Sequence, residues 1–442
     1  MSKLKNKTIR IKRIIVEKLF GFYSYDLIVK NINDDLSRLM ILYGDNGVGK
    51  TTILRLLFYL ISTLDNSGYK SEIAKTKFKR FSVMFDNGVE ITAERNSKDL
   101  IGTYTYGIRK RSKIVYAQTL KVQDDLTIRL DEKSKEYQVY NNILRYIKEL
   151  NILVFYLSDE RELLIGDLEK KDDGDYFDTE TIITASGQKR KIRNESKHFL
   201  LENTVNKLNN WIRTQVLKAS NLGSQNTNNI YLEIIKQIVQ SKKGFKTLSV
   251  SKRSAEVINN LSKIEKVAAE YSKFGIISMF DFNELKKLIV NIPNYKLKII
   301  FNILEPYIEG IQARLEALSS VQTVIYKFVS SVNTYFKDKV INYHLSSGFR
   351  IFDKENVKLD LNKLSSGEKQ MLILFCNAIT ANDEGTIFII DEPEISLNIK
   401  WQRELLMTLL NFSSDGKVQF ILATHSIELL TPFRENVTRL FN

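Results

Sequence analysis

Cysteine and proline are scarce in this chain of 442 residues, which contains one Cys and four Pro. The single Cys376 excludes an intrachain disulfide and any zinc site built from paired thiols, so the chain suits a reducing compartment. The segment 1–20 alternates basic and apolar residues and lacks an unbroken apolar run, which excludes a signal peptide and a membrane span there. We therefore expect a cytoplasmic protein with no membrane partner.

Apolar and basic residues are plentiful instead. Hydrophobic residues make up 43% of the chain and charged residues 27%, which is the balance of a folded globular protein. The length corresponds to about three domain equivalents, enough for a large core and an insertion. The 66 Lys and Arg exceed the 52 Asp and Glu and give a net charge of +14. This excess favours an anionic partner such as nucleic acid, nucleotide or an acidic protein, although general solubility explains it equally well.

A glycine-containing loop lies between a predicted strand and a predicted helix near the N-terminus. The loop GDNGVGKTT fits the pattern G-x-x-x-x-G-K-[ST], and that context is the one in which the pattern binds phosphate. Its backbone N–H groups would point at phosphate oxygens, Lys50 would reach the β- and γ-phosphates, and Thr51 would place its hydroxyl on Mg²⁺. The sequence thus predicts a nucleotide-binding loop made of Gly44, Asp45, Asn46, Gly47, Val48, Gly49, Lys50, Thr51 and Thr52.

Two apolar strands near the C-terminus end in polar residues. The strand IFIID brings Asp391 to its carboxyl end, where we expect it to hold Mg²⁺, and Glu392 follows in a position to activate a water molecule. The strand FILAT is followed by His425, for which we expect a contact with the γ-phosphate. A strand that ends in solvated acids and a structural histidine are the alternatives.

A further polar segment opens a predicted helix. Ser365, Ser366, Gly367 and Glu368 stand at its start, where a helix offers a site for an anion. Because the chain already has a phosphate loop of its own, we interpret this segment as capping the nucleotide of a second subunit. A helix that is simply N-capped by Ser, with Glu368 close by, fits the same residues.

The order of elements predicts one α/β domain built from both ends of the chain and a helical insertion between them. We expect an N-terminal lobe at 1–194, an insertion at 195–345 and a C-terminal lobe at 346–442. Within the insertion we expect helices near 196–219, 230–239 and 254–271 and a long helix from Pro306 to Tyr343 with one apolar stripe. Such a helix needs a partner, either the helix near 196–219 or another subunit, so the insertion is a candidate coiled coil and oligomerisation element.

Taken together, the segments GDNGVGKTT, LSSGEKQ, IFIIDEPE, SLN and ATHS resemble the ABC-type ATPases, in the soluble branch that includes Rad50, RecF and SMC. The resemblance implies a P-loop ATPase head that uses ATP and Mg²⁺, with Gly44 to Thr52 as Walker A and Asp391 and Glu392 as Walker B. It also implies that Ser365 to Glu368 form the signature loop acting across a dimer, Ser396 to Asn398 the D-loop, and His425 the switch histidine.

Within that branch, the motif spellings and the short insertion resemble bacterial anti-phage defence ATPases of the OLD-like, Septu and PARIS types, and size and layout are most similar to the PARIS ATPase subunits. The resemblance implies an ATPase that senses infection, through a phage-encoded trigger protein, and holds or releases a separate TOPRIM-like effector nuclease. We expect dimers joined into a larger assembly such as a hexamer. The alternative is a DNA-repair or chromosome-maintenance ATPase that binds DNA, and a transporter subunit is a third interpretation. For the Q-loop the candidates are Gln118, Ser158 and Arg161.

Overall fold

The computed structural model describes residues 8–30, 38–65, 67–96, 98–160, 163–166, 201–221, 250–278, 282–290, 294–381, 386–413 and 416–441. The chain forms two units: Met1–Arg193 together with Asn377–Asn442, and Asn194–Cys376. The first unit therefore contains both ends of the chain, as the sequence predicts. Residues 346–376, which we expected in a C-terminal lobe, belong to the second unit. The expected helix at 230–239 lies outside the described residues, as does Arg161.

A six-stranded, mainly parallel sheet forms one layer of the first unit, with the strand order β15-β3-β14-β13-β8-β9. Strands β3, β14, β13, β8 and β15 run parallel, and β9 is antiparallel to β8. Parallel strands buried on both faces are typically continuous apolar runs, as these are. The strands are β3 Leu39–Tyr43, β8 Leu153–Leu157, β9 Leu163–Ile165, β13 Thr386–Asp391, β14 Val418–Thr424 and β15 Val437–Arg439.

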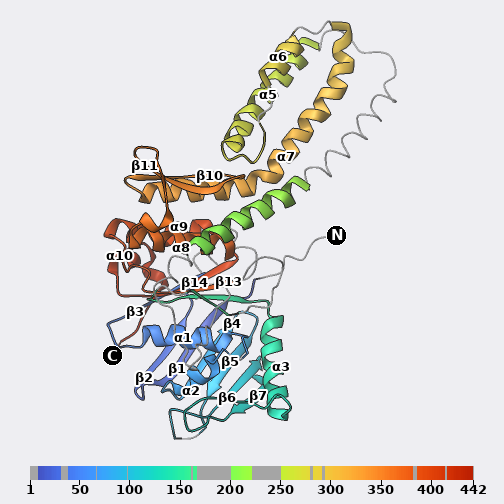
Figure 1. The fold of residues 1–442 in the computed structure, drawn as a ribbon. Coiled ribbons are helices and arrows are strands. Elements are labelled where there is room, and N and C mark those ends of the chain that lie inside the picture. Colours follow the sequence, from blue (N-terminus) through green and yellow to red (C-terminus); the bar gives the residue numbers. More distant parts are fainter. Residues whose placement is uncertain are drawn as a thin grey trace, which may run out of the picture. The chain divides into compact units, whose positions relative to one another are not determined.

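An antiparallel sheet with the order β2-β1-β4-β5-β6-β7 forms a second layer of this unit. The Asp86-Asn87-Gly88 turn joins β4 to β5, so the hairpin predicted from the sequence is confirmed. Helix α3, Lys135–Glu149, packs along β7 (Figure 1). The strands are β1 Ile11–Leu19, β2 Tyr23–Ile28, β4 Arg80–Phe85, β5 Val89–Glu94, β6 Tyr104–Lys110 and β7 Lys113–Leu120.

Helix α1, Lys50–Ile61, contacts strands of both sheets: β8, β13 and β14 of the first and β5 of the second. Its sequence is apolar on nearly every side, as expected for a helix buried between two layers. The short helix α2, Tyr69–Lys75, follows it and packs against it. The C-terminal part of the unit adds α9 Ile399–Phe412, α10 Ile427–Leu430 and the 3₁₀ segment η5 Thr431–Asn436.

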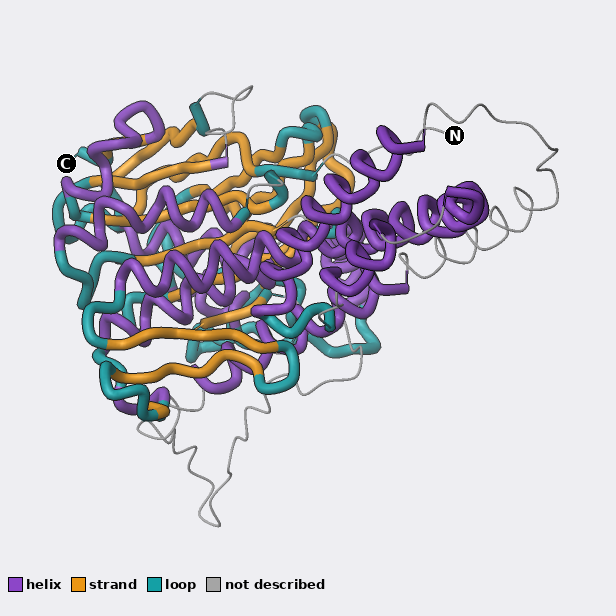
Figure 2. The backbone as a smooth tube through the Cα atoms, turned by 90° about the horizontal axis from the view of Figure 1, so that it is seen from above, coloured by secondary structure: helices purple, strands orange, loops and turns teal. Residues whose placement is uncertain are grey.

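The second unit is mainly helical, and its helices appear as purple coils in Figure 2. A helix at 201–221 comes first, followed by α5 Val250–Lys273, α6 Phe282–Val290 and α7 Asn294–Tyr335. Helix α5 packs against both α6 and α7. The 42 residues of α7 span about 63 Å. None of the described helices is long and apolar enough to cross a membrane.

The limits of the long helix differ from those predicted. It begins before Pro306, which lies inside it, and ends at Tyr335. Residues Lys339–His344 form strand β10, in which Ile341 and Tyr343 are buried while the residues between them are exposed. The Asn333 side chain accepts a hydrogen bond from Ile341 N (2.7 Å) and donates one to Ile341 O (3.0 Å), which reverses the chain after the helix. The spacing of apolar residues extended the predicted helix into β10, because Val340 continues the helical spacing.

Helix α7 packs against α5, a contact that the sequence did not predict. The helix at 201–221, which was the predicted partner, contacts the hairpin of β10 and β11 through Arg213 and Asn209. This hairpin and β12 form a three-stranded antiparallel sheet, after which η3 leads into α8. These elements are β11 Gly348–Asp353, β12 Lys358–Leu359, η3 Leu361–Lys363 and α8 Ser366–Thr380.

Candidate nucleotide site

Four neighbouring parallel strands end at one edge of the sheet, and each is followed by a residue that the sequence analysis considered for the site. Strand β3 leads into the Gly44–Thr52 loop, β13 into Glu392, β14 into His425 and β8 into Ser158. Registers of Asp391 with Ala423 and of Thr424 with Tyr43 place these strand ends level with one another. In open α/β sheets ligands bind at this carboxyl edge. Of the Q-loop candidates, Gln118 lies instead on β7, an edge strand of the antiparallel sheet.

The phosphate loop requires glycine at two positions where it passes other backbone and side chains closely. A Cβ on Gly44 would lie 2.7 Å from the carbonyl oxygen of Leu440. Gly49 has a φ of +92° and precedes α1, and a Cβ there would lie 2.6 Å from Leu19 Cδ2. Because neither position has room for a side chain, the loop can curl tightly and expose its N–H groups at the N-terminus of α1.

Lys50 is buried at the start of α1, and its ammonium group lies inside the loop. Its Nζ donates hydrogen bonds to the carbonyl oxygens of Gly44 (2.7 Å) and Asp45 (3.1 Å) and lies 3.9 Å from Glu392 Oε1. The Tyr25 hydroxyl donates to Val48 O (3.0 Å) from strand β2 and so ties the loop to the antiparallel sheet. A cation held at this point next to a helix N-terminus is the arrangement that binds the phosphates of a nucleotide.

Asp391 is fully buried at the end of β13 and accepts a hydrogen bond from the Tyr156 hydroxyl at Oδ2 (3.2 Å). Burial raises the pKa of Asp391, and hydrogen bonds from the Thr51 and Tyr156 hydroxyls offset this only in part. Among the described residues, Oδ1 makes no hydrogen bond of good geometry. A buried carboxylate oxygen with spare bonding capacity beside a threonine hydroxyl is a donor set that suits Mg²⁺.

Glu392 and His425 are in direct contact. His425 Nδ1 lies 2.5 Å from Glu392 Oε2, and Glu392 N donates to Ala423 O (2.9 Å). Glu392 has a φ of +46°, so its backbone turns sharply as it leaves the strand. Burial, and next the neighbouring carboxylate of Glu394, raise the pKa of Glu392 to about 7, while His425 acts in the opposite direction. A carboxylate with a pKa near neutrality is suited to accept a proton.

Glu394 completes a group of three side chains whose ligand atoms lie within 4.8 Å of one another, with Glu392 and His425. Its Oε1 accepts hydrogen bonds from the Thr424 hydroxyl and from the N–H groups of His425 and Ser426. Because this oxygen already has three donors, we interpret the group as a hydrogen-bonded cluster and not as a metal site.

The segment Ser396–Asn398 leads from this cluster into α9. Ser396 has a φ of +68°, Leu397 is buried, and the Asn398 side chain accepts a hydrogen bond from Trp401 N (3.0 Å). Asn398 is thus the N-cap of α9. This role fixes the direction in which the segment leaves the site.

The signature residues lie in the second unit, at the start of α8. Ser365 N donates to Glu368 Oε2 (2.7 Å), and Glu368 N donates to Ser365 Oγ (3.3 Å), which is a reciprocal capping box. Lys339 Nζ donates to Glu368 Oε1 (3.0 Å). Burial would raise the pKa of Glu368, but hydrogen bonds from Ser365 and Lys339 outweigh it and lower that pKa. The N-capped helix considered as an alternative is therefore present, and Ser365 and Ser366 remain exposed at its end.

Two features of the site were missed in the sequence. Tyr156 and Arg55 extend the Asp391 contact, since Arg55 Nε donates to the Tyr156 oxygen (3.4 Å) and Arg55 lies 3.5 Å from Asp159. Four aromatic residues also gather at the turn between β1 and β2, beside the phosphate loop: Phe20, Phe22, Tyr23 and Tyr25. Their clustering within six positions was visible in the sequence, but their place beside Gly49 was not.

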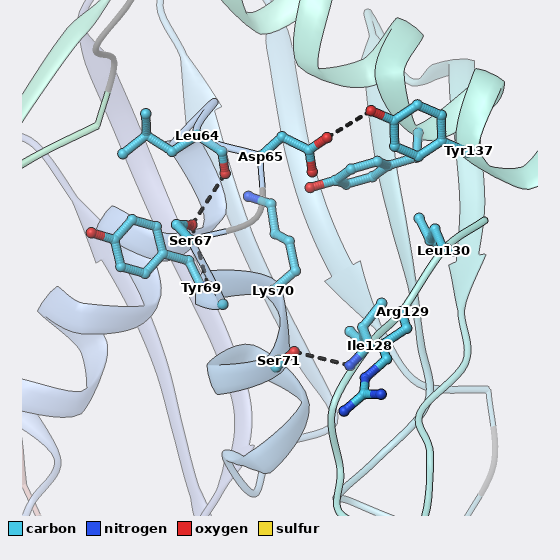
Figure 3. A pocket seen from close by; sticks show the side chains of 12 residues that line it. Leu64, Asp65, Ser67, Tyr69, Lys70, Ser71, Ile128, Arg129, Leu130 and Tyr137 are labelled. Atoms are coloured by element: carbon cyan, nitrogen blue, oxygen red, sulfur yellow. Dashed lines mark hydrogen bonds between the residues drawn. The ribbon is translucent and has the colours of Figure 1, made fainter. Parts of the chain in front are cut away.

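The other end of α1 carries a second buried lysine. Lys70 Nζ donates to the carbonyl oxygens of Tyr59 (2.6 Å), Leu60 (3.2 Å) and Ser62 (3.0 Å), which end the helix. A cavity of about 300 Å³ lies beside it, and in Figure 3 Lys70 extends toward Asp65, which accepts a hydrogen bond from the Tyr137 hydroxyl (2.8 Å). Burial lowers the pKa of Lys70 to about 7. The helix that presents the phosphate loop is thus held at both ends by lysine ammonium groups.

Comparisons with known proteins give distant structural matches and one family match. Three solved structures resemble the chain: a Smc head domain with an extended coiled coil bound to the C-terminal domain of ScpA, from Pyrococcus furiosus, a SmcHead bound to the C-winged helix domain of ScpA, and a Smc head domain with a coiled coil and joint from Pyrococcus yayanosii. The first is 12% identical with a TM-score of 0.38 and covers 98% of this chain and 93% of its own. The second is 10% identical with a TM-score of 0.38 and covers 97% and 94%.

The third is 10% identical with a TM-score of 0.37 and covers 98% of this chain and 95% of its own. Scores at this level carry no inference about ligands or partners. A comparison with curated proteins finds no match. The sequence profile of the AAA ATPase domain, however, matches residues 19–430, which includes the phosphate loop, Asp391, Glu392 and His425. The α/β P-loop ATPase fold predicted from the sequence is confirmed, and the chain belongs to the AAA ATPase domain family.

Proposed function

We propose that the chain is an ABC-type ATP hydrolase that depends on Mg²⁺. One observation carries the proposal: the phosphate loop, Asp391, Glu392 and His425 meet at one edge of the parallel sheet, with Glu392 in contact with His425 and 3.9 Å from Lys50. In this proposal Glu392 and His425 are the catalytic residues, residues Gly44 to Thr52 bind the nucleotide, and Thr51 and Asp391 hold the metal.

Each group has a task that follows from its surroundings. The N–H groups at the start of α1 and the Lys50 ammonium bind the phosphates. Mg²⁺, when bound, neutralises charge on the phosphate oxygens. Glu392 orients the attacking water and accepts its proton, which suits its pKa of about 7. The His425 imidazole holds the Glu392 carboxylate through Nδ1 and presents its other nitrogen to the γ-phosphate.

The aromatic cluster at the turn between β1 and β2 supplies a surface for the adenine ring. Phe22 is 69% exposed and packs edge-on against Tyr23, with ring centroids 4.3 Å apart. The Phe20 ring lies 3.2 Å from the position of a Cβ on Gly49, so the cluster borders the phosphate loop. An exposed phenylalanine held by other rings can stack on a planar base.

We further propose that two copies of the chain enclose ATP, with Ser365, Ser366, Gly367 and Glu368 of one copy facing the nucleotide of the other. The exposed hydroxyls of Ser365 and Ser366 at the N-terminus of a 15-residue helix support this, because such an end attracts anions. Glu368 serves the helix itself through the capping box. Assemblies larger than a dimer, such as a hexamer, would then form through the helical unit.

The test compares wild type with Glu392→Gln and Ser366→Arg. Wild type should hydrolyse ATP in the presence of Mg²⁺, and Glu392→Gln should bind ATP but lose hydrolysis by about 10²-fold or more. The ATP-bound Glu392→Gln protein should form a dimer in light scattering, and the double variant with Ser366→Arg should remain a monomer. Wild-type turnover by Glu392→Gln, or monomers in every ATP-bound sample, would refute the proposal.

We propose that the cellular role of this ATPase is anti-phage defence, in which a phage-encoded trigger makes it release a separate TOPRIM-like effector nuclease. The resemblance of the motifs to anti-phage defence ATPases supports this role. The alternative is a DNA-repair ATPase, a role that the net charge of +14 would suit.

A copurification experiment separates the two roles. Tagged protein expressed with its neighbouring genes should retain a nuclease-like protein in fixed stoichiometry, and expression of phage proteins should release it. Recovery of DNA without a protein partner, with binding that weakens steeply as salt rises, would favour the repair function instead.

A further inference from the structure

We propose that Glu394 is a positioning residue that joins the loops after β13 and β14 and thereby holds Glu392 and His425 in their working geometry. The inference rests on the proposed ATPase function and adds a residue to it. Glu394 does not reach the reacting atoms in this proposal. It acts mainly through the backbone that carries the two catalytic side chains, and its Oε1 also lies 3.5 Å from His425 Nδ1.

The Glu394 carboxylate lies on the loop after β13, and its hydrogen bonds go to the loop after β14. Its Oε1 accepts from His425 N (3.0 Å), Ser426 N (3.1 Å) and the Thr424 hydroxyl. Glu394 is buried, with 5% of its surface exposed, so water does not compete for these donors. One oxygen atom thus satisfies three successive residues at the end of strand β14.

A second link runs parallel to the first. The Ser426 hydroxyl donates to Gln402 Oε1 (2.7 Å), and Gln402 Nε2 donates to Leu397 O (2.9 Å) in the loop after β13. At the strand ends themselves, Glu392 N donates to Ala423 O (2.9 Å). Three sets of hydrogen bonds therefore join the ends of β13 and β14 and the loops that follow them, and the set made by Glu394 includes the N–H of His425.

The backbone of the loop after β13 explains why such a tie is needed. Glu392 has a φ of +46° and Ser396 a φ of +68°, which are unfavourable conformations for residues with a side chain. Without an anchor, the loop would relax toward commoner backbone angles and turn Glu392 away from His425. Displacements of about 1 Å at reacting groups lower rates by roughly 10²-fold.

The positioning role requires the hydrogen-bond acceptor at Oε1 and not the charge, although the Glu394 carboxylate also helps to raise the pKa of Glu392. Glutamine has the same length, and its amide oxygen can accept the same three hydrogen bonds. Alanine removes the acceptor of two partly buried N–H groups and of the Thr424 hydroxyl. Thr424→Val removes the hydroxyl that donates to Glu394 and accepts from Ser426 N (2.9 Å) but keeps the Glu394 carboxylate, so it is a milder variant that keeps the proposal testable if Glu394→Ala does not fold.

The first measurement is steady-state ATP hydrolysis with the dissociation constant for ATP measured beside it. Glu394→Ala should lower kcat by about 10- to 100-fold with little change in ATP affinity, since Glu394 does not contact the phosphate loop. Glu394→Gln should recover kcat to within about threefold of wild type, and Thr424→Val should lie between the two. Glu404→Ala, which removes an exposed carboxylate of α9, is the matched control and should leave kcat unchanged.

The second measurement does not depend on activity. Amide hydrogen exchange of the peptide that contains His425 and Ser426 should be at least about fivefold faster in Glu394→Ala, while the peptide covering Val418–Ala423 stays protected. Glu394→Gln should restore the slow exchange. A structural role spread over the whole unit would speed exchange in both peptides.

Three results would overturn the inference. These are wild-type turnover in Glu394→Ala, a loss of ATP affinity as large as the loss of kcat, and a Glu394→Gln variant as slow as Glu394→Ala. Failure of the proposed function has a different signature, because the wild-type protein would then show no hydrolysis of ATP at all.

Discussion

Replacing Glu392 by glutamine should stabilise the first unit above neutral pH while it stops hydrolysis. The pKa of Glu392 is raised from 4.5 to about 7 by burial, with a further contribution from Glu394. The carboxylate side chain is only 13% exposed, so solvent screens little of this effect. A difference of about 2.5 pKa units between the folded and unfolded states corresponds to ~3 kcal/mol.

The sign follows from proton binding. Between pH 4.5 and about 7 the folded state holds a proton on Glu392 that the unfolded state has released. Stability therefore falls as the pH rises through this window, and the full penalty is present above pH 7. Glu392→Gln has no such proton to lose, so its advantage over wild type should be about 2–3 kcal/mol larger at pH 8 than at pH 5.

Tryptophan fluorescence gives a clean assay because the chain has two Trp residues, Trp211 and Trp401, one in each unit. In a Trp211→Phe background, Trp401 reports urea unfolding of the first unit at pH 5 and pH 8. Glu404→Gln, on the exposed face of α9, is the matched control. An equal effect of Glu392→Gln at both pH values, or a less stable variant at pH 8, would refute the reasoning.

Three further predictions concern other anchors of the fold. Lys50→Met should lower ATP hydrolysis by about 10²-fold or more, because it removes the ammonium group from the phosphate loop, and equilibrium binding of ATP should show whether affinity falls with it. Glu368→Ala should cost about 1–2 kcal/mol in urea unfolding followed by Trp211, since it breaks the capping box and the Lys339 contact, whereas Glu355→Ala on an exposed turn should not. Lys70→Met should destabilise the first unit by about 1–3 kcal/mol because the Tyr59 and Ser62 carbonyl groups at the end of α1 lose their donor, and unchanged unfolding would contradict that role.

The local rules of the sequence were sufficient for the phosphate loop and the strands around it. The pattern of the phosphate loop lies between an apolar run that forms a strand and one that forms a helix, and this order is typical of a phosphate-binding loop. Its residues are Gly44, Gly49, Lys50 and Thr51. The Asp86-Asn87-Gly88 turn was recognisable for the same reason, since its backbone conformation is set by three adjacent residues. Asp391 and Glu392 were recognised because they directly follow an apolar run that forms a buried strand, so they stand at the carboxyl end of that strand.

The helical segment shows where periodicity was not enough. The apolar stripe of α7 was correctly identified, yet its end was placed at Tyr343 although the helix ends at Tyr335. Strand β10 is specified by its pairing with β11 and by the hydrogen bonds between Asn333 and Ile341. Neither interaction can be inferred from the spacing of apolar residues along a helix. Likewise, the partner of α7 depends on which helices pack together, which the sequence of one helix does not contain.

The sequence by itself determined the α/β P-loop ATPase class and the residues that gather at the carboxyl edge of the parallel sheet, because a phosphate loop and an apolar strand that ends in acids are local patterns of a few adjacent residues. Only the tertiary structure decided how these groups are supported. Tyr156 reaches Asp391 across 235 positions, and Glu394 holds the N–H of His425 across 31. Such contacts depend on the order of strands in the sheet, and the strand order is set by packing of the whole unit and not by any segment of it.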